Sequence, residues 1–342
     1  MVYMSDSRQN MRNLTRLLIS ALLAGSAGVG AGCQGDAATG TSDLSMQTAG
    51  IYRTGQGVWE TPYGTGAVLS TDHYKIWTTL PEHSRLRKAL PGFLEAARAN
   101  YLQLTGLGDG DRRQPMPVYV LADRTQWDHL TRHRMNRSVQ IETGGYTADG
   151  VCVFWDIGPL HTLSVAAHEG LHQFFYHRLR ERNPMWLEEG LCATAEGFEI
   201  TDRGVVFTPD RNNSRFSDLR QTITRGYWKP LEELLKMHSM DAAREGFSEK
   251  AVGYYGQLWA LMHMIRHTPR YRAGMERLLA DASAGRFHTV LGVSRRQLHR
   301  MRRNPLTYNR AVSLPLFRHY ISDDLEAFQA EYRAYAENLV GG

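Results

Sequence analysis

Apolar and polar residues alternate along three short stretches in the first half of the chain, and such alternation is typical of strands. These stretches are residues 73–78, 117–121 and 151–155. Between them, apolar residues recur at helical spacing over residues 83–104, which contain Pro91, and over residues 125–133. The third strand is expected to start after a turn at Gly144 and Gly145, and a helix carrying apolar residues from 163 to 175 follows it.

The second half of the chain has a helical pattern. Helices are predicted near residues 231–237, 254–267, 271–284 and 323–339. In the second of these, Leu258, Leu261, Met262 and Ile265 lie at the i, i+3, i+4 and i+7 positions that form one buried face. Residues 201–227 show little periodicity and are expected to form a loop over the site.

This order of elements predicts an α+β fold. A small mixed sheet should carry the helix around residues 163–175 on one face, and a mainly helical C-terminal half should follow. We expect one domain over residues 67–342, divided into an α/β part at 67–200 and a helical part at 201–342. Residues 33–66 are rich in Gly, Ser, Thr and Ala and are expected to form a flexible tether.

Residues 1–32 have the features of a signal peptide. Arg8, Arg12 and Arg16 precede an apolar run at residues 17–24, and small residues follow. Residues 29–33 resemble a bacterial lipobox ending at Cys33, although Gly30 replaces the usual Leu. A lipoprotein signal is therefore expected, which would anchor the protein in the cell envelope through lipidated Cys33. Ordinary cleaved secretion and an uncleaved anchor helix are the alternatives.

Composition adds one exclusion. The 342 residues are 42% hydrophobic and 22% charged, as in ordinary globular proteins. The net charge of +5 falls to +3 when residues 1–32 are set aside, so the charge does not indicate a nucleic-acid partner. A basic run at residues 295–303 is read as a solvated helix face, with contact to anionic lipid or polymer as the alternative.

The chemistry of the chain centres on the sequence His168-Glu169-Gly170-Leu171-His172, an HExxH motif. Residues four apart share one helix face, so both imidazoles can bind one metal ion, and Glu169 stays beside any water held there. A catalytic zinc needs a third protein ligand. Glu188 and Glu189, on a second helix that opens near Trp186, both compete for that role. They point about 100° apart, so only one can face the metal.

HEGLH followed by Pro-x-Trp-Leu-x-Glu-Gly resembles the gluzincin metallopeptidases of the peptidase MA clan. The resemblance implies a zincin-like fold, a Zn²⁺ ion bound by His168, His172 and Glu189, and a peptide or protein substrate. It also implies that a strand lines the cleft and pairs with extended substrate. The strand near residues 150–155 is a candidate, and an interior position for it is as consistent with the pattern.

Residues 254–261 resemble a helix of a bacterial peptidase-MA-like family that is known mainly as a domain of unknown function. By analogy with the aminopeptidase branch of the gluzincins, Tyr255 is expected to open this helix and to donate to the oxyanion, with Tyr254 as its competitor. Cys192 departs from the pattern, since a small residue such as Ala is usual there. Cys152 and Cys192 form either a disulfide or two free buried thiols.

The sequence therefore predicts an exported, zinc-dependent metallohydrolase, most simply a gluzincin peptidase in which Glu169 is the general base. The alternative is a zinc-containing envelope binding or scaffold protein without turnover, which would have no need of Glu169. His263 and His267 also lie four residues apart, but the sequence shows no third ligand at a recognisable spacing for a second metal site.

Overall fold

The computed structural model describes residues 17–18, 55–110, 114–135, 144–202, 204–244 and 249–341. Within them, the sheet strands are β1 (Leu17–Leu18), β2 (Gly55–Thr61), β3 (Gly64–Ser70), β4 (Tyr74–Thr78), β5 (Met116–Leu121), β6 (Gly145–Ala148) and β7 (Val151–Trp155). The order of the six longer strands is β6-β7-β5-β4-β3-β2, and the two residues of β1 pair antiparallel with β6. Strands β4, β5 and β7 are mutually parallel, while the outer strands are antiparallel, so the sheet is mixed as expected.

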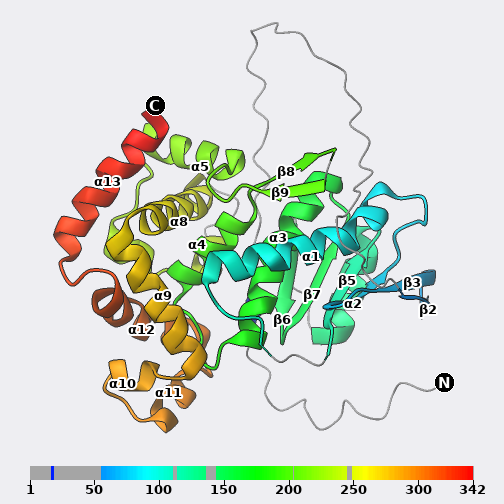
Figure 1. Ribbon diagram of the computed structural model, residues 1–342, viewed down its shortest axis with the longest axis horizontal. Coiled ribbons are helices and arrows are strands. Elements are labelled where there is room, and N and C mark those ends of the chain that lie inside the picture. The colour runs from blue at the N-terminus through cyan, green and yellow to red at the C-terminus, as the bar shows by residue number, and fades with distance from the viewer. Residues whose placement is uncertain are drawn as a thin grey trace, which may run out of the picture.

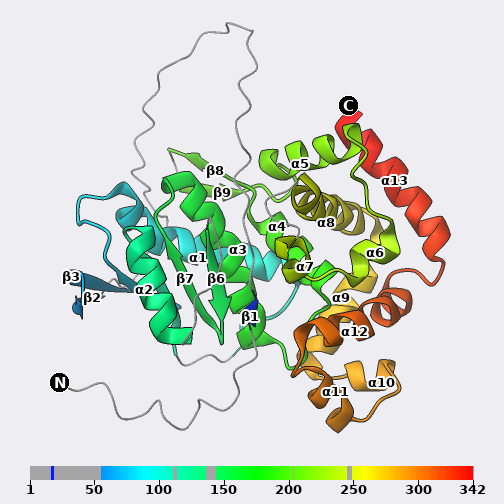
Figure 2. The ribbon, with the colours of Figure 1, turned by 180° about the vertical axis from the view of Figure 1, so that it is seen from behind.

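Helices cover both faces of this sheet. Helices α1 (Arg85–Thr105) and α3 (Pro159–Arg178) lie on one face, and α2 (Arg124–Met135) lies on the other (Figures 1 and 2). Successive side chains of β7 point to opposite faces of the sheet, so each face has its own apolar core. Cys152 and Phe154 join the main core beneath α1 and α3, whereas Val153 and Trp155 pack with Trp127 of α2 in a smaller core.

The C-terminal half is helical, as the sequence predicts. Its helices are α5 (Asn213–Thr224), α6 (Leu231–Lys236), α7 (Ser239–Arg244), α8 (Glu249–His267), α9 (Pro269–Ala284), α10 (Phe287–Val290), α11 (Arg295–Met301), α12 (Pro305–Tyr320) and α13 (Leu325–Gly341). Helix α4 (Met185–Ala195) lies between the two halves and packs on α3, α1 and α8 (Figure 1). At Gly190 of α4, an added Cβ would lie 2.5 Å from Met262 Cγ, so glycine permits the close approach of α8.

The predicted tether is too long at its C-terminal end. Strand β2 and the start of β3 lie inside residues 33–66, joined by a turn in which Gly64 has a φ of 112°. The hairpin is rich in Gly and Thr, and its Val58 is 71% exposed, so no regular apolar pattern marks it. The other residues of the expected tether and signal peptide, including Cys33, lie outside the described residues apart from Leu17–Leu18.

Two further predictions are wrong in detail. Residues 201–227 are not a loop, because they contain the end of a β-hairpin, β8 (Phe198–Thr201) and β9 (Gly204–Phe207), and helix α5. Strand β7 does not begin after a turn at Gly144 and Gly145. Gly145 starts β6, and the actual turn is Asp149-Gly150, where both residues have positive φ.

Strand β7 is an interior strand, and β6 is the strand at that end of the sheet, beside β1. The candidate edge position for residues 150–155 is therefore wrong, and the interior alternative is correct. Residues 295–301 of the basic run form α11, whose Arg295, Arg296, His299 and Arg300 are exposed, as expected for a solvated helix face. Arg302 differs, because its side chain is 15% exposed and forms an ion pair with Glu181. Within the described ranges, no helix has both the length and the apolar character needed to cross a membrane.

Candidate metal centre and catalytic site

Helix α3 carries the HExxH motif through the centre of the molecule. It begins at Pro159, whose missing N–H is no loss in a first turn, and its residues from Val165 to Phe175 are all buried. The helix can lie this deep because position 170 is glycine. A Cβ there would lie 2.5 Å from the hydroxyl of Tyr101, which donates a hydrogen bond to the carbonyl oxygen of Ala167. The side chains of His168, Glu169 and His172 are thereby held at 0% exposure.

Helix α4 begins after Pro184 and brings Glu189 to the two imidazoles. Its Oε2 lies 3.3 Å from Nε2 of His168 and 3.6 Å from Nε2 of His172. Ligand atoms placed tetrahedrally at zinc-like bond lengths are about 3.3 Å apart. Oε2 of Glu189 therefore has ligand-like spacing from each of the two imidazoles.

Glu188 occupies a different position from its neighbour. Its Oε1 accepts a hydrogen bond from Nδ1 of His172 over 3.0 Å. The same arrangement exists at the other histidine, where Nδ1 of His168 donates to Oε1 of Glu196 over 2.7 Å. Each imidazole thus has a carboxylate at Nδ1, which fixes the tautomer and leaves Nε2 to accept a metal ion. The geometry favours Glu189 as the ligand and gives Glu188 an orienting role.

Glu196 is itself held by a buried arginine that the sequence analysis missed. Arg215 of α5 donates to both oxygens of Glu196 over 2.8 Å, and to Asp218 over 3.0 Å. Burial alone would raise the pKa of Glu196, but the charge of Arg215 outweighs burial and lowers it. Helix α5 had a local signal. Asn212 caps its N-terminus by accepting from the backbone N–H of Arg215, and Phe216, Leu219 and Ile223 follow at helical spacing.

The side chain of Glu169 lies in the same buried region but is bonded differently. Neither of its carboxylate oxygens makes a hydrogen bond of normal geometry with any described residue. Its backbone carbonyl is fixed by Thr147 of β6, whose Oγ1 donates over 2.8 Å, and by the thiol of Cys152 at 3.3 Å. Burial raises the pKa of Glu169, while the nearby His172 and His168 oppose that shift. A buried, unpaired carboxylate beside a metal-ligand cluster suits a group that exchanges a proton with substrate or water.

Tyr255 and Tyr254 lie on α8, which begins at Glu249, so Tyr255 does not open the helix as predicted. The rings of Tyr255 and His168 meet edge to face with their centroids 6.3 Å apart, and the guanidinium of Arg215 lies over the Tyr255 ring, 5.0 Å from its centroid. Burial raises the pKa of both phenols well above the usual value, so both stay protonated and can donate. Each hydroxyl is buried and has no partner among the described residues. After burial, the charge of Glu189 is the largest influence that raises the pKa of either phenol, so both lie near the cluster. The ring contact with His168 belongs to Tyr255, which favours Tyr255 for contact with reacting atoms.

His238 is a second residue that the sequence analysis missed. Its Nδ1 accepts from the backbone N–H of Met240 over 3.1 Å, so Nε2 carries the proton and is a donor. That Nε2 is buried and has no partner within the described part of the chain. Burial lowers the pKa of His238 to about 4, and the charges of Glu189 and His172 act on it as well. No sequence spacing marks this residue, which directly precedes α7, a helix that packs on α8.

The two described cysteines are free and buried, which confirms the free-thiol alternative over the disulfide. Cys192 belongs to the site. The ligand atoms of His168, His172 and Cys192 all lie within 4.8 Å of one another, so these residues form a group that could hold a metal ion. Burial raises the pKa of the Cys192 thiol to about 12, and Glu189 adds to the shift, so this donor is neutral in the metal-free protein.

A small cavity of about 100 Å³ lies beside α3 and is lined by Phe175 and Tyr176 of that helix, but not by the candidate metal ligands. Thr147 and Glu188, which contact the motif helix, line it together with Asn183, Arg182 and Arg302. The side-chain amide of Asn183 is buried, and neither its oxygen nor its nitrogen has a partner within the described ranges. The cavity therefore offers polar groups for a ligand, and Glu188, which is bonded to Nδ1 of His172, is the residue that connects it to the candidate site.

In comparisons with known proteins, no family model matches the chain, and no curated protein matches its sequence. The assignment of a function therefore depends on the motif and on the geometry of the site.

Proposed function

We propose that the protein is an exported, zinc-dependent peptidase with a zincin-like fold of the gluzincin type. One observation carries this proposal above the others. Oε2 of Glu189 lies 3.3 Å from Nε2 of His168 and 3.6 Å from Nε2 of His172, and a second carboxylate is hydrogen-bonded to Nδ1 of each imidazole. This is the arrangement of ligands and orienting groups on which zinc enzymes depend.

The chemistry of the donor set fits zinc. Two imidazoles and one carboxylate leave a fourth position open, as in catalytic zinc sites. Glu189 is preferred to Cys192 as the third ligand. The two histidines lower the pKa of Glu189 far below its usual value against the effect of burial, so it is anionic, whereas the thiol is neutral. When bound, zinc supplies a Lewis acid that polarises a carbonyl and acidifies water.

The protein's own groups carry the protons. Glu169 is the general base, which accepts a proton from the attacking water and passes it to the leaving amine. The pKa raised by burial makes this carboxylate a stronger base than an exposed glutamate. Tyr255 donates a hydrogen bond to the developing oxyanion, and the Nε2–H of His238 is available as a second donor.

The end of the sheet supports an extended peptide as substrate. Thr147 of β6 bonds to the carbonyl of Glu169, so β6 runs directly beside the catalytic base. Leu17–Leu18 pairs antiparallel with Thr147 and Ala148, which supports the proposal that an extended peptide can pair with β6. A substrate bound there in the same way would lie across Glu169, held by main-chain hydrogen bonds.

The location of the protein is proposed from its N-terminal residues. Cleavage before Cys33 and lipidation of that residue would anchor the enzyme to a bacterial membrane outside the cytoplasm. A fatty-acid probe should label the wild-type protein and should not label Cys33→Ser. Unlabelled wild-type protein in the soluble envelope fraction would indicate plain secretion instead.

A non-catalytic zinc-binding role in the envelope is the second candidate, because the complete burial of His168, His172 and Glu189 is also typical of structural metal sites. Glu169 argues against this role, since a structural site does not need a buried carboxylate without a hydrogen-bond partner.

The experiment that separates the two is cleavage of a mixed peptide library. The zinc-loaded protein should cleave peptides, a chelator should stop cleavage, and added zinc should restore it. A metallated, folded protein that cleaves nothing in the library would favour the binding role.

A further inference from the structure

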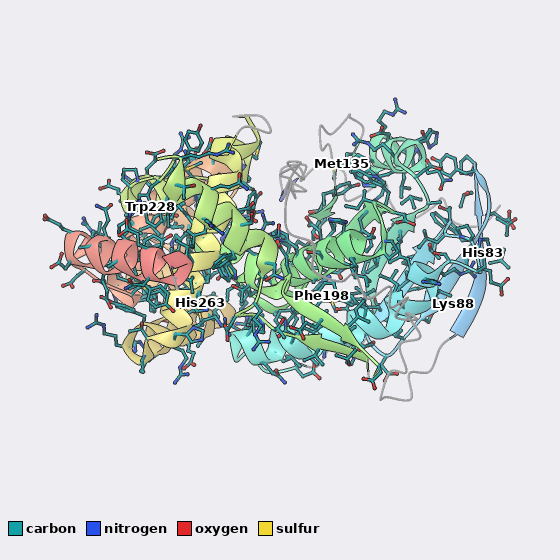
Figure 3. The ribbon with its side chains drawn as sticks, turned by 90° about the horizontal axis from the view of Figure 1, so that it is seen from above. His83, Lys88, Met135, Phe198, Trp228 and His263 are labelled. Atoms are coloured by element: carbon teal, nitrogen blue, oxygen red, sulfur yellow. The ribbon has the colours of Figure 1, made fainter. Side chains whose placement is uncertain are left out.

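A second group of metal-ligating side chains lies in the helical half, away from the HExxH motif. It consists of Asp210, from the turn after β9, and His263 and His267 of α8 (Figure 3 labels His263). One ligand atom from each residue lies within 4.8 Å of the others. Nε2 of His267 is 3.4 Å from Oδ2 of Asp210, and the two imidazole rings are stacked with centroids 4.3 Å apart.

Hydrogen bonds fix the orientation of both rings. Nδ1 of His267 lies 2.7 Å from the backbone carbonyl oxygen of His263, and a carbonyl can only accept, so the proton is on Nδ1 and the lone pair is on Nε2. Nδ1 of His263 is bonded to the hydroxyl of Tyr335 over 2.7 Å. In both residues Nε2 is therefore the nitrogen available for a metal, as in sites where a second group holds Nδ1.

The carboxylate is positioned in a comparable way. Arg266 donates to Oδ1 of Asp210 over 2.6 Å, which leaves Oδ2 directed at the histidine pair. Asp210 is the third donor that the sequence could not show, because it lies more than 50 residues before His263.

We propose that Asp210, His263 and His267 bind a divalent transition-metal ion. Two imidazoles and a carboxylate form a donor set suited to zinc, nickel or copper rather than to calcium or magnesium. The side chains of His267 and Asp210 are 43% and 45% exposed, so the ion and its water ligands have access from solvent. Because Arg266 places a positive charge beside the site, it binds more weakly than the buried cluster at His168.

The ion would cross-link two segments of the fold. Asp210 lies in the connection that leads into α5, and both histidines lie near the C-terminal end of α8. A bound ion would fix this connection to α8 and so hold α5, which carries Arg215, against the helix with which it packs. Binding to the folded state alone would raise the melting temperature in a concentration-dependent manner.

The test is zinc stoichiometry of the full-length protein by equilibrium dialysis at micromolar free zinc. Wild type should bind two equivalents, and both His267→Ala and Asp210→Asn should bind one. His299→Ala removes an exposed histidine of α11 that is outside the site and should keep both equivalents. His267 is 43% exposed, so its replacement should leave the melting temperature in chelator unchanged.

The outcome for this site is separable from the outcome for the proposed peptidase centre. A wild-type protein that binds one equivalent, kept in His168→Ala and lost in His267→Ala, would support the second site and contradict the first. The proposal would be overturned if His267→Ala and Asp210→Asn both still bound two equivalents. It would also be overturned if wild type bound only one equivalent and that equivalent was at the His168 site. As a check on ligand type, the cobalt-loaded protein should lose part of its visible absorption in His267→Ala but not in His299→Ala.

Discussion

Replacing Glu196 by Gln tests whether the buried network behind the metal ligands controls the site. Glu196 accepts four hydrogen bonds: one from Nδ1 of His168, two from Arg215, and one from the amide of Asn212 at 3.1 Å. Glutamine keeps the shape but removes the charge. It also turns an NH₂ group toward donors that cannot accept it. Both the imidazole and the guanidinium lose their anionic partner.

The magnitude follows from the burial of this pair. Breaking a buried ion pair costs about 3–5 kcal/mol because one charge is left uncompensated. Asp218 still lies 3.0 Å from Arg215, so the cost should be near the lower limit, about 3 kcal/mol. For zinc, loss of a carboxylate behind a ligating histidine lowers affinity about 10- to 100-fold. That loss corresponds to about 1.4–2.8 kcal/mol of binding free energy.

The matched control is Glu199→Gln, the same change three residues further along the chain. Glu199 is 53% exposed and lies 3.7 Å from Arg211, so its replacement should change stability by less than about 0.5 kcal/mol. Urea unfolding in chelator gives the stability of each variant, and competition with a coloured chelator gives the zinc affinity of the folded fraction. Equal zinc affinity for Glu196→Gln and Glu199→Gln would refute the orienting role of Glu196.

Three further predictions concern individual residues. Tyr255→Phe should lower kcat by about 10²–10³-fold at unchanged zinc content, while Tyr254→Phe should change kcat little. Steady-state kinetics on metallated protein measure this. Native-like turnover by Tyr255→Phe would eliminate the oxyanion role of Tyr255. Gly170→Ala should lower the free energy of unfolding by about 1–3 kcal/mol, although alanine favours helix, because its Cβ would lie 2.5 Å from the Tyr101 hydroxyl. Adding Tyr101→Phe to this variant should recover part of the lost stability, as measured by urea unfolding. The pKa of His238 is about 4 in the folded state and about 6.5 in the unfolded state, so protonation favours unfolding. The unfolding free energy of chelator-treated protein should therefore fall by up to about 3 kcal/mol as the pH is lowered from 6.5 to 4. His238→Asn keeps an acceptor for the backbone N–H of Met240 and should reduce this dependence of the unfolding free energy on pH. The same dependence in wild type and His238→Asn would contradict the prediction.

Much of the architecture was predictable from periodicity. Strands β4, β5 and β7 and helices α1, α2, α3, α6, α8, α9 and α13 lie where the apolar pattern places them. These elements bury one face or both, so their sequences carry a strong period. Helix α1 continues through Pro91, since the helix packs firmly on the sheet and on α3.

The elements that the apolar periodicity did not predict are short or exposed, or are marked only by turn and cap residues. Strand β6 is four residues long, too short for a period, but the Asp149-Gly150 pair that turns it into β7 is a recognised hairpin sequence. Hairpin β2–β3 lies at the exposed end of the sheet and needs few apolar residues. Helix α12 begins at Pro305 after an Asn304 cap, so a start signal was present there as well.

The site was predictable as far as local spacing extends. Spacing gave the i and i+4 histidines and left Glu188 and Glu189 as competitors, and the gluzincin resemblance implied Glu189. The structure adds the distances that favour Glu189, because its Oε2 lies near both Nε2 atoms while Glu188 is bonded to Nδ1 of His172. Glu196 and Arg215 could not be found, because their roles depend on three helices meeting around one buried charge pair. For the same reason, spacing could not reveal His238 or Asp210.

The most direct test of the central claim is peptide cleavage by Glu169→Gln compared with wild type, both with zinc content measured on the same preparation. The substitution spares His168, His172 and Glu189 and removes only the base. The two proteins should therefore carry the same zinc at the His168 site, and the variant should cleave the library at least about 100-fold more slowly. Cleavage at the native rate by zinc-loaded Glu169→Gln would contradict the account.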